Sequence, residues 1–135
     1  MHKLLILFIA LAGCASTIET RSVQSDLELY VHLIDTGRTA WGCVPAARPF
    51  GPAHPRYARM QEQAMARRDR IRAELIRREG SRFTDLEAET NRLAEQEEAS
   101  ILRTGGCYRE VAERERGRYH RILRQLEKRL GLARY

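Results

Sequence analysis

The sequence predicts a small all-α fold, a bundle of three to four helices with a central antiparallel hairpin. Apolar residues recur every three or four positions along most of the chain, which is the period of an amphipathic helix. No segment shows the strict alternation of apolar and polar residues that indicates a half-buried strand. The chain has 135 residues, of which 43% are hydrophobic and 31% are charged, and this composition is typical of one folded domain.

The first helix is expected to begin at Ser25, because Ser25-Asp26-Leu27-Glu28 matches a capping box. Gly37 predicts its end. Residues 37–55 hold all four prolines of the chain and are expected to form an irregular loop. The apolar stripe of this first helix consists of Leu27, Tyr30, Val31 and Ile34.

Three more helical patterns follow. The second helix is expected over residues 55–79 and should stop at Gly80-Ser81. A second capping box, Thr84-Asp85-Leu86-Glu87, predicts the start of the third helix, which Gly105-Gly106 should end. A last helix is expected from Cys107 to about Leu130, although Gly117 within it costs ~1 kcal/mol relative to alanine.

Charge is distributed unevenly along these helices. Residues 56–82 carry nine arginines and four acidic residues, whereas residues 84–98 carry six acidic residues and one arginine. The turn between them is short, so the two helices should form an antiparallel hairpin that their opposite charges favour. Residues 103–135 carry ten basic and four acidic residues, and this net charge of +6 has no obvious counter-charge in the chain.

The N-terminus has the three-part layout of a secretory signal. Met1-His2-Lys3 is a short basic region, and residues 4–12 are an uninterrupted apolar run of nine. That run is too short to span a bilayer, which needs about 20 apolar residues. It leads into Leu11-Ala12-Gly13-Cys14, which closely resembles the lipobox of bacterial lipoproteins. The alternative is an ordinary signal peptide with an incidental cysteine.

The lipobox resemblance implies that residues 1–13 are removed as a signal peptide and that Cys14 carries the lipid. Residues 14–24 would then be a flexible tether to a helical domain of residues 25–135. The residue directly after Cys14 is Ala15 and not an aspartate, and in the lipoproteins of Gram-negative bacteria an aspartate at that position retains the protein in the inner membrane. The resemblance therefore implies an anchor in the outer membrane, on its periplasmic face, through several acyl chains.

Two cysteines remain if Cys14 is lipidated, namely Cys43 and Cys107. An exported protein meets an oxidising environment in which such a pair can form a disulfide. Both cysteines fall at the open end of the expected hairpin, opposite the Gly80-Ser81 turn, so a bond would tie the bundle there. It would close a loop of about 64 residues, worth ~4 kcal/mol in the chain-entropy model. The alternative is two unrelated free thiols.

Candidate catalytic or metal-binding residues are few. His32 shares a helical face with Glu28 and Asp35, a trio that would suit Zn²⁺ but is more often a solvated surface. His54 lies among prolines, and His120 has no carboxylate three or four positions away, whereas a catalytic histidine usually needs such a partner. We therefore expect no enzyme activity, no metal and no cofactor, and we interpret the glutamates of residues 84–98 as surface charge.

The layout of the three cysteines suggests a function. A lipid-bearing Cys14 followed by a helical domain with Cys43 and Cys107 resembles, in overall layout, the helical secretin pilotins of bacterial secretion systems. This resemblance implies a non-enzymatic protein that binds a helix of an envelope protein and delivers it to the outer membrane. It identifies no binding residues in the present chain.

A candidate surface comes instead from the helical period. The stripe Tyr119, Ile122, Leu126 and Leu130 should pack inward, and the opposite side of the last helix is then basic. The residues expected there to bind an acidic partner are Arg114, Arg121, Arg124 and Lys128.

Other functions stay open at this point. They are a structural envelope lipoprotein that binds peptidoglycan or the membrane, and an inhibitor of a secreted enzyme. The basic side of the last helix would also suit a plain solvated surface. Nucleic acid, a natural partner of a basic protein, is not expected because the chain is predicted to be exported. The sequence does not define the oligomeric state.

Overall fold

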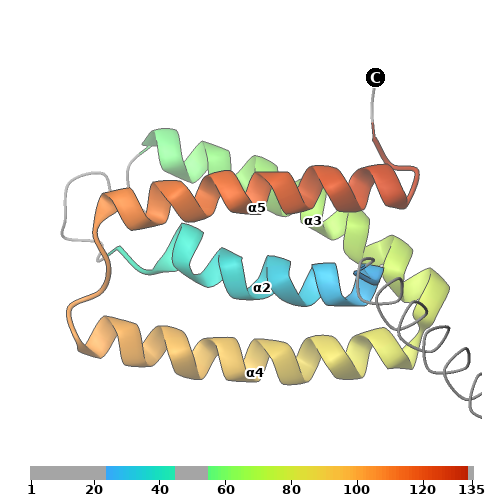
Figure 1. Cartoon of the computed structure of the whole chain (residues 1–135), viewed down its shortest axis with the longest axis horizontal. Coiled ribbons are helices and arrows are strands. Elements are labelled where there is room, and N and C mark those ends of the chain that lie inside the picture. Colours follow the sequence, from blue (N-terminus) through green and yellow to red (C-terminus); the bar gives the residue numbers. More distant parts are fainter. Residues whose placement is uncertain (1–23, 45–54, 134–135) are drawn as a thin grey trace, which may run out of the picture.

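The computed structural model describes residues 24–44 and 55–133, which form an all-α bundle (Figure 1). The predicted fold class is confirmed, and neither described range contains a strand. The predicted signal peptide, Cys14, most of the tether and His54 lie outside the described residues. The four helices of the described residues are α2 (Asp26–Gly42), α3 (Pro55–Glu79), α4 (Ser81–Arg103) and α5 (Arg109–Arg129).

Helix α2 begins as predicted but ends later. The Ser25 hydroxyl accepts a hydrogen bond from the backbone N–H of Glu28 at 3.1 Å, which satisfies an N–H group of the first turn. Gly37 does not end the helix. A Cβ atom at Gly37 would lie 3.0 Å from the ring of Tyr119, so this glycine allows close packing against α5, and Trp41 becomes a helical core residue instead of a loop residue.

Helices α4 and α5 begin elsewhere than predicted. Helix α4 starts at Ser81, three residues before the capping box at Thr84, because Gly80 alone makes the turn with a φ of 57°. That angle is in the left-handed region, which glycine adopts without steric cost. Helix α5 starts at Arg109 and continues through Gly117 to Arg129.

Helix α2 is the central element of the bundle. Figure 1 shows it between α5 and α4, while α3 crosses behind α5. The most extensive contact of α2 is with α5, and the next is with α4. All four helices contribute side chains to the core, and those no more than 1% exposed include Leu33, Ile71, Leu75, Phe83, Tyr119, Leu123 and Leu126.

Helices α3 and α4 form the predicted hairpin around Gly80 and diverge away from it (Figure 1). Their opposite charges meet close to the turn, where Arg72 Nε lies 2.8 Å from a carboxylate oxygen of Glu87. Farther from the turn, the carboxylates of α4 pair with α2 instead of α3. Arg38 of α2 lies 2.8 Å from Glu98 and 3.6 Å from Glu95. Divergence of the two helices thus limits the expected seam of charge to the turn.

The predicted disulfide between Cys43 and Cys107 is present, with the two Cα atoms 5.3 Å apart. The backbone N–H of Cys107 also donates to the carbonyl of Cys43 at 2.9 Å. Val44 and Ala112 are buried beside this bond in a small apolar cluster. The bond ties the end of α2 to the segment that leads into α5, at the end of the bundle opposite Gly80.

Candidate functional site

The residues predicted to bind a partner lie on the outer side of α5. Arg114, Arg121, Arg124 and Lys128 are all exposed, and the side chain of Arg114 is 74% exposed. Their exposure follows from the inward packing of Tyr119, Ile122, Leu123 and Leu126 on the other side of the helix. The structure therefore brings the four cations onto one helical surface, as the spacing predicted.

Arg118 belongs to the same surface and was missed in the sequence analysis. It is exposed and lies one turn after Arg114 and one turn before Arg121, so the three side chains are neighbours along the helix. The spacing of four and then three residues in the sequence was a sufficient signal for it. We refer to Arg114, Arg118, Arg121, Arg124 and Lys128 as the α5 basic face.

Most of this face lacks a counter-charge. Arg114 lies 3.8 Å from Glu115, a distance that adds little at an exposed site. Among residues 24–44 and 55–133, no carboxylate lies within ion-pair distance of the other four cations. Four unpaired positive charges of the C-terminal stretch are therefore available to solvent, or to a partner, on this helix.

A groove runs along one side of the α5 basic face, between α5 and α3. Its volume is about 710 Å³. Arg124 and Lys128 line it from α5, while Arg67 and Arg70 line it from α3. The buried carboxylate of Glu127 also lines the groove and accepts hydrogen bonds from Arg67, one of them at 3.1 Å from Nε. This pairing raises the pKa of Arg67, and it leaves three of the four cations without a carboxylate in the groove.

A second groove of about 380 Å³ lies on the other side, between α5 and the start of α2. Arg118 and Arg121 line it from α5, and His32 lines it from α2. The α5 basic face is thus a ridge with a groove on each side. Its cations divide between the two grooves instead of converging on one point.

Arg116 is the exception among the arginines of α5, because it is 5% exposed. Its Nε donates to the carbonyl of Ala40 in the last turn of α2 at 2.8 Å. Its guanidinium carbon lies 4.1 Å from the ring centre of Tyr57 and 5.4 Å from that of Trp41. Burial lowers its pKa. A cation at the C-terminal end of a helix is stabilised by the helix dipole, so Arg116 is a structural cation.

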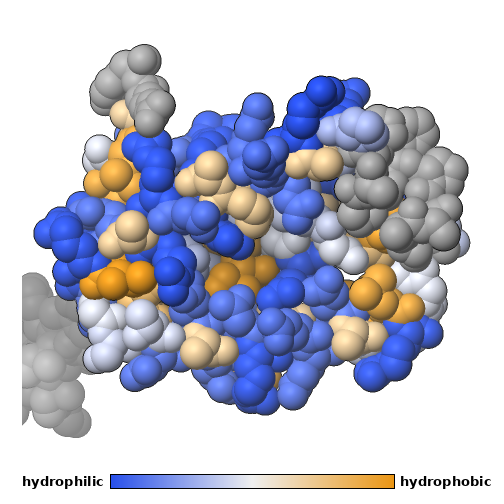
Figure 2. Space-filling model, turned by 180° about the vertical axis from the view of Figure 1, so that it is seen from behind, coloured by the Kyte–Doolittle hydropathy of each residue, from blue (hydrophilic) through white to orange (hydrophobic). Residues whose placement is uncertain are grey.

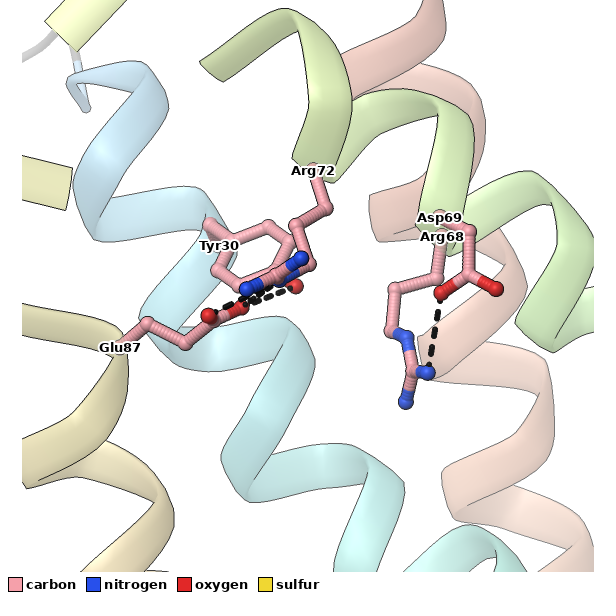
Figure 3. Close-up of polar contacts among 5 residues, drawn as sticks. All are labelled: Tyr30, Arg68, Asp69, Arg72 and Glu87. Atoms are coloured by element: carbon pink, nitrogen blue, oxygen red, sulfur yellow. Dashed lines mark hydrogen bonds and ion pairs between the residues drawn. The ribbon is translucent and has the colours of Figure 1, made fainter. Parts of the chain in front are cut away.

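A three-helix network of polar side chains lies near the Gly80 turn (Figure 3). The hydroxyl of Tyr30 on α2 donates to Glu87 of α4 at 3.0 Å. Arg72 of α3 donates from Nε to both oxygens of the same carboxylate, at 2.9 and 2.8 Å. Burial and the neighbouring carboxylate of Glu87 raise the pKa of Tyr30, which keeps its donor proton in place. This network therefore has a structural role, which is to hold α2, α3 and α4 together.

The histidines take no part in a metal site within the described chain. No group of three or more histidine, cysteine or acidic side chains is placed to hold a metal ion in residues 24–44 and 55–133. His32 is exposed on α2. His120 is partly buried, with its ring centre 6.1 Å from that of Trp41. Burial, and then the charges of Arg67 and Arg124, lower its pKa.

Comparison of the chain with protein-family models, with curated proteins and with solved structures yields no match. Of the described helices, none combines the length and the apolar character needed to cross a bilayer.

Proposed function

We propose that this protein is a lipoprotein anchored in the outer membrane, on its periplasmic face, where it acts as a non-enzymatic binding and assembly factor for an envelope protein complex, much as pilotins do. The observation that carries the proposal is the α5 basic face, four of whose five cations have no carboxylate partner in the described chain. An acidic segment of a partner protein is the ligand that such a face recognises.

The distribution of the other charges supports the same proposal. Carboxylates of α3 and α4, such as Glu74, Glu87, Glu89 and Glu98, pair with arginines of the bundle. Helix α5 instead keeps its unpaired cations on the side that does not pack. Their placement on a regular helix fixes their spacing, and a partner helix with acidic residues one turn apart would match that spacing.

The membrane anchor has its own test. Intact-mass analysis of protein extracted from membranes should give residues 14–135 with added acyl mass. The variant Cys14→Ala should stay unprocessed or leave the membrane, because the thiol forms the bond to the lipid. A soluble mature species that begins at another residue would refute the anchor.

Partner binding is tested by reversing charge on the α5 basic face. The variant Arg114→Glu, Arg121→Glu and Arg124→Glu should recover much less partner from solubilised envelope, and should lose the salt dependence of capture. A control with the same change in charge reverses the exposed Arg59, Arg82 and Arg103 of α3 and α4, and it should capture the partner as the parent chain does. Equal recovery by both variants, with both folded by circular dichroism, would reduce the α5 basic face to a solvated surface.

A further inference from the structure

A separate feature of the bundle is the cleft that opens where α3 and α4 diverge. Helix α2 supplies its floor, with Trp41 among the floor residues, and α3 and α4 supply its walls. Gln61 and Arg68 line it from α3, and Asn91 and Glu98 line it from α4. Figure 2 views the molecule from the side of α3, where apolar surface near the middle is enclosed by polar residues. We refer to this space as the α3–α4 cleft.

Glycines of α2 shape the cleft. The carboxylate of Glu98 packs so closely on Gly42 that a Cβ there would lie 2.5 Å from one of its oxygens. Arg38 holds this carboxylate at 2.8 Å. The charge of Glu98 in the wall of the cleft is therefore neutralised by Arg38. Its carboxylate is held in position by Arg38 and by the close approach that Gly42 allows.

Several hydrogen-bonding groups around the cleft are unused. Trp41 is 7% exposed, and its indole N–H is buried without an acceptor, as is the Nε–H of Arg68. A buried donor left unpaired is unfavourable, so a ligand that supplies an acceptor nearby would relieve this cost. Gln61 and Asn91 are partly buried, and their amides bond no residue of the described chain.

One cation of the cleft, Arg68, can change its carboxylate partner. The Arg68 guanidinium is hydrogen-bonded to the neighbouring Asp69, whose carboxylate accepts from Nη2 at 3.1 Å (Figure 3). The side chain of Asp69 is 64% exposed, and exposed ion pairs are weak. Arg68 can therefore exchange this contact for a carboxylate seated in the cleft, to which a guanidinium binds in a bidentate manner.

The size of the cleft limits its occupant. Its volume is about 300 Å³, which is at the lower end of the range for small-molecule sites. This space suits a ligand of the size of a dipeptide and is too small for a helix. The side-chain amides of Gln61 and Asn91 each offer a donor and an acceptor, which complement a peptide group.

We propose that the α3–α4 cleft binds a carboxylate that stands next to an amide, as in an acylated amino acid or at the C-terminus of a peptide. Arg68 takes the carboxylate, and Gln61 and Asn91 take the amide. The site lies away from the α5 basic face, so it does not depend on the function proposed above.

Trp41 makes the proposal directly testable, because it is the only tryptophan in the chain and gives one indole N–H resonance. N-acetyl-L-alanine is titrated into the mature protein, and we expect a saturable shift of that resonance. N-acetyl-L-alaninamide, which lacks the carboxylate, and acetate, which lacks the amide, should each bind at least about tenfold more weakly. Equal shifts with all three compounds, or no saturable shift, would overturn the proposal.

Two variants and a control locate the binding. Arg68→Gln should weaken the binding of N-acetyl-L-alanine at least about tenfold, whereas Arg59→Gln, on the same helix but outside the cleft, should not change it. If Arg68→Gln fails to fold, Asn91→Asp tests the same point, since it places a negative charge beside the bound carboxylate. Unchanged affinity in the folded variant would contradict the assignment.

A further titration distinguishes the two sources of this chemistry. A hexapeptide that ends in a free alanine carries the same carboxylate and amide as N-acetyl-L-alanine. Equal affinity for both would assign the cleft to polypeptide ends. Binding of the small compound alone would assign it to a free acylated amino acid.

Discussion

Helix α2 is packed on two sides in different ways. Toward α5 the contact is mainly apolar, and Leu33 of α2 shares a core with Tyr119, Leu123 and Leu126 of α5, each no more than 1% exposed. Two polar contacts join the same helices, from Arg116 to the carbonyl of Ala40 and between Arg129 and Asp26. Toward α4 the buried set is small, and Leu93 of α4 stays 51% exposed. On that side arginine–glutamate pairs and a hydrogen-bonded tyrosine do much of the joining.

This difference suggests how stability and binding are divided. The apolar side buries enough surface to fix α5 rigidly, so the outer side of that helix can carry unpaired charge. The polar side packs less completely, and the space left there is the α3–α4 cleft. We therefore expect substitutions on the α5 side of α2 to change stability most, and those on the α4 side to change it least.

The largest effect should follow from removal of the disulfide on the α5 side. The double variant Cys43→Ser and Cys107→Ser opens the loop that the bond closes between residues 64 positions apart. In the chain-entropy model this loss corresponds to ~4 kcal/mol of unfolding free energy. Urea unfolding of the variant and the parent chain measures this loss. A difference below about 1 kcal/mol would mean that the core alone holds α2 to α5.

A buried leucine on α5 and an exposed leucine on α4 give the next comparison. Leu123→Ala removes a side chain that is 0% exposed, and we expect a loss of about 2–5 kcal/mol because a cavity forms. Leu93→Ala on α4 should cost no more than about 0.5 kcal/mol, as for other exposed positions. Urea unfolding of the two variants checks the order. Similar losses would contradict the division between the two sides.

The contact between Tyr30 and Glu87 on the α4 side should have an intermediate effect. Glu87→Ala leaves the hydroxyl of Tyr30, which is 3% exposed, without its acceptor, and we expect a loss of about 1–3 kcal/mol. Tyr30→Phe removes the donor as well. The double variant should therefore be more stable than the sum of the single losses predicts, and additive losses in a thermodynamic cycle would show that the two groups do not interact.

The sequence predicted the fold class because the relevant signals are local. Capping at Ser25, the apolar stripe of the last helix and the position of the two cysteines each depend on residues close in sequence, or on helix ends that such residues define. The same local rules failed at Gly37. This glycine allows close packing against Tyr119. Because the two residues are distant in sequence, their contact leaves no periodic signal.

The site was predictable to a similar extent. Helical spacing placed Arg121 and Arg124 on the outer side of α5, and it would have placed Arg118 there as well. The net charge of residues 103–135 counted Arg116 with the other basic residues, whereas this arginine is buried against the end of α2. The α3–α4 cleft was missed because it depends on the angle at which two helices diverge, which is set by the packing of α2 and not by either helix alone.

The smallest effect concerns the pH dependence of the α5 side. The pKa of His120 is lowered by burial and then by Arg67 and Arg124, so the unfolded chain takes up the proton at a higher pH than the folded one. The free energy of unfolding should therefore be highest above about pH 6.5, should fall as the pH drops through that value, and should level off below the pKa of the folded state. The effect is small because His120 is only partly buried. His120→Gln should flatten this slope between about pH 7.5 and 5, whereas the control His32→Gln, at an exposed position, should retain it; an unchanged slope in His120→Gln would assign the acid sensitivity to other groups.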